Sequence, residues 1–441
     1  MEKEKIIVGI DIGTTKICVI VGRINEFEKV EILALGKTDS LGVSRGVVAN
    51  INKTVTAIER ALDIAEAKLN DNEFEINEVY VGIAGQHISS RQNRGILTRK
   101  DTDSEISESD IGKLIDDMYR LMLDPGERII HVLPQEFLVD NEPGIKDPIG
   151  MPGVRLEANF HIITGQVAAA KDIHRCVEKA GLKVKDLVLE PLASADAVLS
   201  DEEKEAGVAL VDIGGGTTDI AIFQDNIIRH TAVIPAGGNI ITQDIKEGLH
   251  ILEKYAERLK VEYGSAIPLR EMEQEVVTIP SLRNRPPKEI SLYSLAQIIR
   301  ERVIDIIDQV YYEINTSGYQ KRLLGGIVLT GGGAQLRHLA QLVELRTGID
   351  ARIGCPSEHV NKSVVEDICH PMFATGVGLI IHGYNAEKDR KRKLEGVEVE
   401  HTAQAPQTTF TVKGSQTRNW WKTLTNKVKD FLEEDVDDFK S

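Results

Sequence analysis

Two segments of this chain repeat one pattern, and the repeat limits the folds that the chain can adopt. They are IIVGIDIGTTK at residues 6–16 and VALVDIGGGTTD at residues 208–219. Each is an apolar run, an aspartate and a Gly/Thr turn followed by a second apolar run, which predicts a strand, a tight turn and an antiparallel strand. One such segment is weak, because similar turns end many ordinary hairpins. Two copies more than a typical domain length apart predict a duplicated core.

The turns of the two hairpins have the composition of a phosphate-binding loop. Glycine admits positive φ and lets a ligand approach the backbone, while Thr hydroxyls and exposed N–H groups can hold phosphate oxygens. Asp11 and Asp212 each end a strand, where a carboxylate can hold Mg²⁺ through its water shell. We therefore expect two hairpins that close on one nucleotide. The turn residues expected to hold its phosphates are Gly13, Thr14, Thr15, Gly214, Gly215, Gly216, Thr217 and Thr218.

Length and composition exclude several classes of protein. The 441 residues suffice for two or three domains. A net charge of −16 argues against nucleic-acid binding, which needs a basic face. No apolar run is long enough to span a membrane, and the N-terminus lacks the apolar core of a signal peptide. The four cysteines are scattered without a C-x-x-C pair, so we expect unpaired thiols in a reducing cytoplasm.

The order of predicted elements divides the chain into six segments. A strand and helix pattern follows the first hairpin, is interrupted by a polar insertion and then resumes; the second half repeats the scheme. After residue 384 the apolar periodicity stops, which predicts a flexible linker before a last helix. The segments are the first-half core (1A, 1–84 and 166–205), the inserted subdomain (1C-like, 85–165), the second-half core (2A, 206–244 and 312–384), the outer subdomain (2B, 245–311), the linker (385–417) and the tail helix (418–434).

Three further segments contain closely spaced small residues. A predicted strand at 326–329 runs into a Gly331–Gly333 turn, and a helix is predicted to begin near Gln335. Glycine backbone at a helix N-terminus suits a phosphate or an adenosine, although ordinary strand-to-helix turns have the same pattern. The predicted helices 190–199 and 371–379 are rich in Ala, Ser, Thr and Gly, which would let them cross closely as a hinge. Plain core packing is the alternative.

In this order, the five segments resemble the nucleotide-binding motifs of the actin, sugar kinase and heat-shock chaperone ATPase superfamily. The resemblance covers residues 5–384. Within the superfamily, the chain is similar to the FtsA family of bacterial cell division proteins, whose core looks like actin with one outer subdomain missing and another inserted in the first half. The resemblance implies an α/β fold: a duplicated actin-like ATPase core, two halves with mixed sheets flanked by helices, an FtsA-type inserted subdomain and a C-terminal amphipathic helix.

The resemblance also implies ATP and Mg²⁺ as cofactors and a role for each matching residue. Lys16 completes the match to the first phosphate loop, and Asp11 and Asp212 match the ligands of Mg²⁺-bound water. Glu190 matches the residue that orients the attacking water, although a carboxylate there would also stabilise a helix N-terminus. An E-x-x-K pair on one helix face matches the element that contacts base and ribose; a solvated salt bridge is its alternative. The residues expected beside the adenosine are Glu257, Lys260, Gly332, Gly333 and Gln335.

The tail segment RNWWKTLTNKVKDFL, residues 418–432, has a sharp helical pattern. At 100° per residue its apolar side chains fall within an arc of about 120°, and lysines and polar residues occupy the rest. A short helix after a linker needs a surface to order it, and indoles with lysines suit an anionic bilayer surface. Docking on the protein itself or on a partner is the alternative, and the acidic residues at 433–438 should weaken lipid binding. The apolar residues are Trp420, Trp421, Leu424, Val428, Phe431 and Leu432.

The similarity to FtsA implies a function in bacterial cell division. Proteins of that family polymerise, bind the C-terminal tail of the tubulin-like FtsZ, anchor the FtsZ ring to the cytoplasmic face of the cell membrane at the septum and help recruit other division proteins. Any ATP hydrolysis should be slow. The FtsZ tail binds their outer subdomain, where Arg300 and Arg302 are the expected contacts of that acidic peptide. Ordinary surface charge is the alternative for both arginines.

Other branches of the superfamily fit the sequence less well. A sugar kinase needs an aspartate base opposite the γ-phosphate, for which the sequence offers no clear candidate, and it has no use for the tail. A chaperone ATPase would need a peptide-binding domain, and we expect none after the core. A pilus-assembly homologue and the cell-shape homologue of actin are nearer alternatives, and the insertion and the tail argue against the latter.

Overall fold

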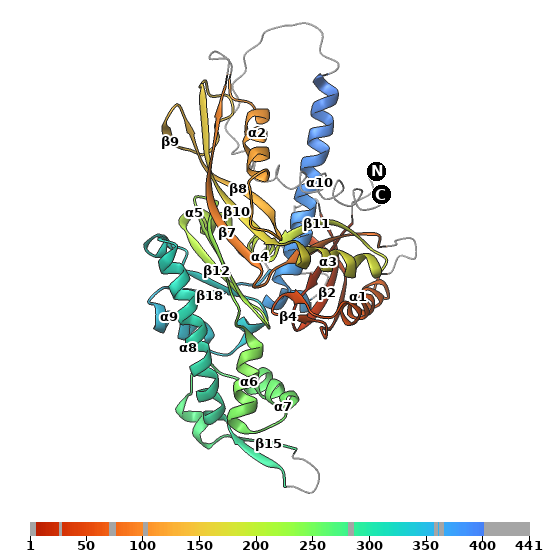
Figure 1. The fold of residues 1–441 in the computed structure, drawn as a ribbon. Helices are drawn as coiled ribbons and strands as arrows, with labels where there is room; N and C mark the ends of the chain where they lie inside the picture. The colour runs from red at the N-terminus through yellow and green to blue at the C-terminus, as the bar shows by residue number, and fades with distance from the viewer. Residues whose placement is uncertain are drawn as a thin grey trace.

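The computed structural model describes residues 6–25, 29–69, 76–99, 105–280, 286–356, 360 and 366–400. These residues form two halves and an inserted subdomain, arranged along an elongated molecule (Figure 1). Within these ranges, each helix is too short or too polar to span a membrane. The predicted tail helix, 418–434, lies outside the described residues.

The first half is built on a five-stranded sheet in the order β3-β2-β1-β6-β11. The hairpin strands pair antiparallel, while β6 and β11 extend the sheet in parallel. Helices α1 (Ile51–Glu66) and α3 (Val167–Lys179) pack against this half. The strands are β1 (Ile7–Ile12), β2 (Lys16–Ile24), β3 (Val30–Asp39), β6 (Glu78–Ile83) and β11 (Lys183–Leu189), with a small ribbon of β4 (Val43–Ser44) and β5 (Val47–Val48) beside them.

The second half repeats this arrangement strand by strand, in the order β14-β13-β12-β17-β18. Again the first three strands pair antiparallel and the last two continue in parallel. The predicted duplication is therefore confirmed. The strands β12 and β13 are almost wholly buried, as expected for central strands made of continuous apolar runs. The elements are β12 (Val208–Ile213), β13 (Thr218–Gln224), β14 (Ile227–Ile234), β17 (Ile327–Thr330), β18 (Ala351–Ile353), α9 (Leu339–Thr347) and the short helices η2 (Gln320–Arg322), η3 (Gly332–Gln335) and η4 (Glu366–Cys369).

The outer subdomain is mostly helical. The long helix α8 (Leu292–Thr316) joins it to the second-half core. Residues 238–263 form two helices and not one, because His250 takes a left-handed conformation with φ of 49°. The remaining elements are α6 (Gly238–Leu249), α7 (Glu253–Tyr263), η1 (Arg270–Gln274), β15 (Val276–Ile279) and β16 (Lys288–Ser291).

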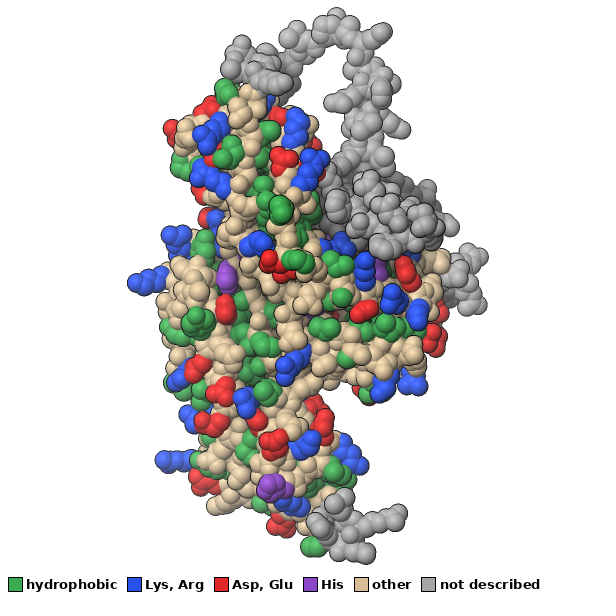
Figure 2. All heavy atoms as spheres, in the orientation of Figure 1, with side chains coloured by type: hydrophobic (Ala, Val, Ile, Leu, Met, Phe, Trp, Pro, Cys, Tyr) green, Lys and Arg blue, Asp and Glu red, His purple; other side chains and the backbone are tan. Residues whose placement is uncertain are grey.

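The inserted subdomain has its own core. Helix α2 (Glu108–Tyr119) covers one face of a sheet in the order β7-β10-β8-β9, and Leu114, Phe137 and Phe160 are fully buried between them. In Figure 2 charged side chains of both signs are interspersed over this subdomain and the rest of the visible face. The strands are β7 (Ile88–Thr98), β8 (Glu127–Val139), β9 (Glu142–Ile145) and β10 (Arg155–Gln166).

Two helices connect the halves and cross each other, as predicted from their small residues. Helix α4 (Glu190–Val198) follows the first-half sheet and leads through α5 (Asp201–Ala206) into the second. Helix α10 (Ala374–Glu400) comes from the second half after η5 (Pro371–Phe373) and packs on β1 and β2. A Cβ on Gly378 would lie 1.8 Å from the carbonyl oxygen of Ala193, so only glycine permits this approach.

Helix α10 corrects the boundary of the predicted linker. The helix continues through Glu400, so a flexible linker from residue 385 is wrong for its first part, and residues 401–417 lie outside the described residues. A packed helix can extend into a polar segment of good helix formers without an apolar stripe. Tertiary contacts also hold this segment: the Glu387 carboxylate is buried, accepts a hydrogen bond from the Tyr80 hydroxyl at 3.3 Å and pairs with Lys185.

Candidate functional site

The two Gly/Thr turns have the same geometry. Each hairpin closes with a four-residue turn in which the first N–H donates to the last carbonyl. Gly13 N–H donates to the Lys16 carbonyl at 3.0 Å, and Gly214 N–H donates to the Thr217 carbonyl at 2.9 Å. The similarity extends the duplication from the topology to the turns themselves.

The structure brings the two turns into contact. A Cβ on Gly215 would lie 1.8 Å from Oγ1 of Thr15, and one on Gly216 would lie 2.7 Å from Oγ1 of Thr14. Each turn therefore offers backbone and hydroxyl groups to the same small space. Thr217 and Thr218 are exceptions, because both are buried and their hydroxyls donate to Asp219 Oδ2 at 3.0 Å and to the Ala236 carbonyl at 2.8 Å.

Asp212 lies where the two connecting helices meet. Its Oδ2 accepts a hydrogen bond from the Ser194 hydroxyl of α4 at 2.8 Å and lies 3.5 Å from the Thr375 hydroxyl of α10. The two hydroxyls are 3.0 Å apart. At the end of β1, Asp11 is also buried and pairs with the Lys16 ammonium. Each predicted Mg²⁺ aspartate is therefore fixed by a neighbour, and one of them by both helices.

Negative charge accumulates around these aspartates. Burial raises the pKa of Glu190 well above its usual value, and the charges of Asp11, Asp219 and Asp212 raise it further. The side chain of Glu190 lies over β6, since a Cβ on Gly82 would be 2.9 Å from its Cγ. Burial likewise raises the pKa of Asp212. Burial opposes the charge of Lys16, but the adjacent Asp11 carboxylate outweighs it and raises the lysine pKa. Such a cluster favours a bound cation.

Asp219 belongs to the cluster and was missed by the sequence reasoning. It pairs with Asp212 in the register of the hairpin and is buried. The Thr217 hydroxyl donates to its Oδ2 at 3.0 Å, whereas its Oδ1 has no hydrogen-bond partner among the described residues. Burial, followed by the charge of Asp212, raises its pKa to about 7. The signal was present in the sequence, because a four-residue turn places the second aspartate of DIGGGTTD opposite the first.

The E-x-x-K pair joins two helices at the edge of the site. Lys260 Nζ lies 2.7 Å from Glu257 Oε2 and donates to the Gly238 carbonyl at 2.9 Å and to the Thr242 hydroxyl at 2.8 Å. Gly238 N–H donates in turn to the Gly214 carbonyl of the second turn. The Lys260 side chain is 14% exposed and that of Glu257 is 39% exposed, so only the lysine is largely withdrawn from solvent. Figure 2 shows a notch in the outline where α6 and α7 face the first half.

The glycine turn after β17 also packs on the second hairpin. Gly331 has φ of 84°, and a Cβ there would lie 2.2 Å from Oδ1 of Asp212; Gly333 packs on Ile213 in the same way. Gly332 and Gln335 are exposed and near open space. The helix predicted to begin near Gln335 is present, but its predicted start is wrong by four residues. Residues 332–335 form the short helix η3, and α9 begins only at Leu339, because His338 takes a left-handed φ of 61°.

The two arginines predicted to bind a partner differ in their surroundings. Both lie on α8. Arg302 pairs with Asp244, with Nη2 to Oδ1 at 3.1 Å, and with Asp305. Arg300 is more exposed and lies 3.3 Å from Glu301. Neither pair tests the predicted role, but Arg300 is the more accessible of the two.

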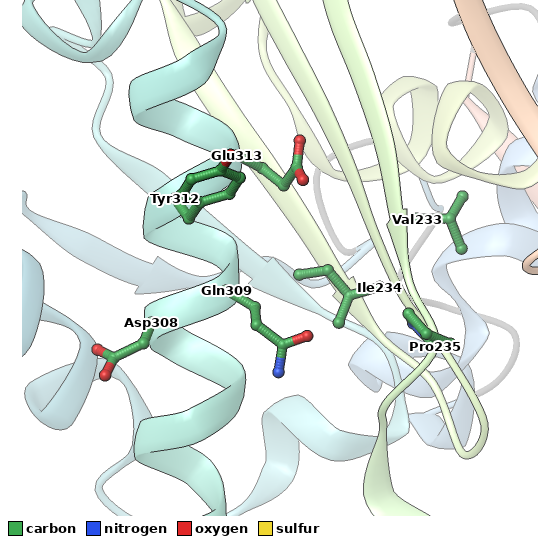
Figure 3. A pocket seen from close by; sticks show the side chains of 7 residues that line it. All are labelled: Val233, Ile234, Pro235, Asp308, Gln309, Tyr312 and Glu313. Atoms are coloured by element: carbon green, nitrogen blue, oxygen red, sulfur yellow. The ribbon is translucent and has the colours of Figure 1, made fainter.

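A cavity of about 360 Å³ lies between the end of β14 and α8 (Figure 3). In Figure 3, Gln309 points toward Ile234 while Asp308 points away. Asp308 instead binds Arg346, with both oxygens at 2.7 Å. The lining residues are Val233, Ile234, Pro235, Asp308, Gln309, Tyr312 and Glu313.

Comparisons of the sequence with known proteins decide the family. The model of the cell division protein FtsA matches residues 209–378, and that of the SHS2 domain inserted in FtsA matches residues 85–164. The cell division protein FtsA of Pseudomonas aeruginosa is 39% identical over 389 residues, covering 88% of this chain and 92% of that protein. The chain belongs to the FtsA family of cell division proteins. FtsA of Escherichia coli K12 is 34% identical over 400 residues, covering 89% and 93%.

Solved structures show the same fold at low sequence identity. A chain of the PilM–PilN type IV pilus biogenesis complex superposes with a TM-score of 0.62 at 16% identity, covering 86% of this chain and 98% of that chain. MreB5 of Spiroplasma citri bound to ADP gives a TM-score of 0.50 at 16% identity, covering 89% and 98%. The predicted fold class, an actin-like core with mixed sheets flanked by helices and an FtsA-type insert, is therefore confirmed.

Replacement of Asp219 by asparagine should stabilise the ligand-free protein at high pH. The pKa of this carboxyl is raised from 3.8 to about 7, so ionisation destabilises the folded state. The cost is absent below pH about 4 and complete above pH about 7. In urea titrations at pH 8 the free energy of unfolding of Asp219→Asn should exceed that of the parent by roughly 2–4 kcal/mol, a gain that fades toward pH 4. The exposed Asp124→Asn should show no such gain. Equal stability of Asp219→Asn and parent at pH 8 would contradict the description of the cluster.

Proposed function

We propose that this FtsA-family protein binds ATP with Mg²⁺ between its two Gly/Thr turns and that bound ATP favours a closed arrangement of the halves. The observation that carries the proposal is the convergence of both turns and both strand-end aspartates on one place. The residues fit the ligand. Oδ1 of Asp219 has no hydrogen-bond partner among the described residues, and this oxygen and the surrounding carboxylates suit hydrated Mg²⁺. Backbone N–H groups and hydroxyls of the turns suit phosphate oxygens, which would enter as the turns separate, because the turns touch in this structure. MreB5, a protein of the same fold, was solved bound to ADP.

Each side chain has a distinct part in this proposal. The turn residues and Lys16 hold the phosphates, and Asp11 and Asp212 hold water molecules of the cation. The adenosine lies beside Lys260, Glu257, Gly332, Gly333 and Gln335. Bound Mg²⁺ would neutralise phosphate charge. Glu190, at the start of α4, would orient a water molecule, and the protein would be at most a slow ATPase.

The further part of the proposal concerns assembly. We infer that the closed, ATP-bound chains polymerise on the cytoplasmic face of the cell membrane at the septum, held there by the amphipathic segment 418–434. Weak contacts of single copies add up when many copies assemble. The polymer anchors the FtsZ ring through the FtsZ C-terminal tail and helps recruit other division proteins. Family membership and the tail pattern support this proposal.

Removal of the tail should abolish membrane binding without affecting the nucleotide site. Deletion of residues 418–441 should eliminate co-sedimentation with liposomes that contain anionic lipid, while binding of a fluorescent ATP analogue stays unchanged. A truncation after Leu432 is the matched control. It removes the acidic end but keeps the apolar face, so its co-sedimentation should increase. Retention of lipid binding after the full deletion would exclude the membrane proposal.

Charge reversal on α8 should weaken binding of the FtsZ tail. Arg300→Glu alone, and together with Arg302→Glu, should lower the affinity for a fluorescent FtsZ tail peptide by about tenfold or more, which is about 1.4 kcal/mol. Arg258→Glu on α7 reverses a charge in the same subdomain and should leave the affinity unchanged. If the Arg300→Glu and double variants bind like the parent, these arginines are not part of the FtsZ site.

A further inference from the structure

The inserted subdomain covers an edge of the second half. β14 is the last strand of the second-half sheet, so its outer carbonyl groups need partners other than a strand. Figure 1 shows β7, β8 and β10 extending toward that sheet. The inserted subdomain lies in the sequence between β6 and α3, which are elements of the first half. A contact between parts that belong to different halves would change whenever the halves move.

Side-chain donors from the insert satisfy the edge of β14. Gln135 Nε2 donates to the carbonyl of Ile228 at 2.7 Å and to that of Arg229 at 3.2 Å. Gln92 Nε2 lies 3.4 Å from the Arg229 carbonyl, and the Ser90 hydroxyl donates to the Thr231 carbonyl at 3.1 Å. The edge is therefore covered without a β-ladder, by hydrogen bonds that can break one at a time.

A β-bulge on each side shapes this contact. The register of β8 against β10 skips Gln135, and the register of β14 against β13 skips Arg229. A bulge bends its strand and re-aims the extra residue. Here the extra residue of one strand donates to the carbonyl of the extra residue of the other. Two β-bulges that contact each other indicate a specific interface between β8 and β14.

A buried histidine completes the interface. His161 Nδ1 lies 3.2 Å from the Gln92 amide nitrogen, and its Nε2 lies 2.9 Å from the Thr231 hydroxyl. Because an amide NH₂ group only donates, Nδ1 accepts and Nε2 carries the hydrogen. Burial and the nearby His230 lower the pKa of His161 to about 4, which keeps the ring neutral. The contact with Thr231 is therefore directional.

Strand β8 joins this interface to the candidate nucleotide site. Four residues before Gln135, His131 Nε2 accepts the N–H of Leu189 at 3.1 Å. Leu189 directly precedes Glu190 and the helix α4. One short stretch of β8 thus binds the first half beside the acidic cluster and the second half at the β14 edge. Four residues of a strand extend about 13 Å, so this connection is short and stiff.

We propose that the inserted subdomain, through β8, is a brace whose hold on β14 depends on the nucleotide between the two halves. The proposal rests on the proposed function, because nucleotide is the ligand that moves the halves. The covalent connections between the halves are limited to α4–α5, the segment before α10 and α10 itself, so rotation at the crossing shifts β14 relative to β8. A hydrogen bond of 2.7 Å does not survive a shift of about 1 Å. By reciprocity, loss of the brace changes nucleotide affinity.

Hydrogen exchange measured by mass spectrometry on the full-length chain tests the brace. Addition of ATP and Mg²⁺ should slow exchange in the two hairpins, residues 9–22 and 208–224, and also in β8 and β14. In Gln135→Ala the hairpins should still respond, whereas β8 and β14 should not. The affinity for ATP should fall by about fivefold or more, because the lost contacts belong to the arrangement in which the turns touch. Gln135→Glu keeps the side-chain volume but replaces the donating NH₂ group with an accepting carboxylate oxygen, and it should have the same effect.

Gln341→Ala is the matched control, since this glutamine is exposed on α9, at the other end of the second half from β14. It should leave exchange and affinity unchanged. Protected hairpins with unchanged β8 and β14 in the parent chain would overturn the brace and leave the proposed ATP site standing. No protection in the hairpins would overturn the ATP site and the brace together. The measurement on the parent chain decides between these outcomes even if a variant fails to fold.

Discussion

The crossing of α4 and α10 is the contact on which the rest of the structure depends. The helices approach so closely at Ala193 and Gly378 that no side chain fits at the glycine. At the same point Ser194 and Thr375 bring their hydroxyls to Asp212. The joint between the halves and the carboxylate expected to hold the cation are therefore one piece of structure. A movement of either half would change the hydrogen bonds of Asp212, and a ligand bound at Asp212 would change the contact between α4 and α10.

The electrostatics of the site explain why a ligand should matter to this joint. Glu190, Asp212 and Asp219 all have raised pKa values, because burial and mutual repulsion disfavour their charges. Lys16 is the neighbouring cation and is already paired with Asp11. A protein that keeps such a cluster gives up stability for function. Mg²⁺ with ATP would relieve the repulsion, so binding energy would become available for holding the two halves in one arrangement.

Local patterns predicted much of this molecule, and long-range contacts account for the rest. The hairpins, the duplication and the crossing helices follow from residues close in sequence. The end of the core was misplaced because Glu387 is held by Tyr80 and Lys185, which lie far away along the chain. The helix expected to begin near Gln335 begins later, at Leu339, because His338 takes a left-handed conformation. The contact of Gln135 with β14 depends on two bulges, and no periodicity in the sequence marks a bulge.

We propose that the pair of Gly/Thr turns acts as an assembly switch and not primarily as a catalytic site. Electron microscopy of the full-length protein on lipid monolayers with and without ATP and Mg²⁺ tests it most directly. The account predicts filaments on the lipid only when nucleotide is present, and none for a variant such as Asp212→Asn that weakens the clamp. Protein that binds ATP yet stays dispersed on the monolayer, or that forms the same filaments without nucleotide, would contradict it.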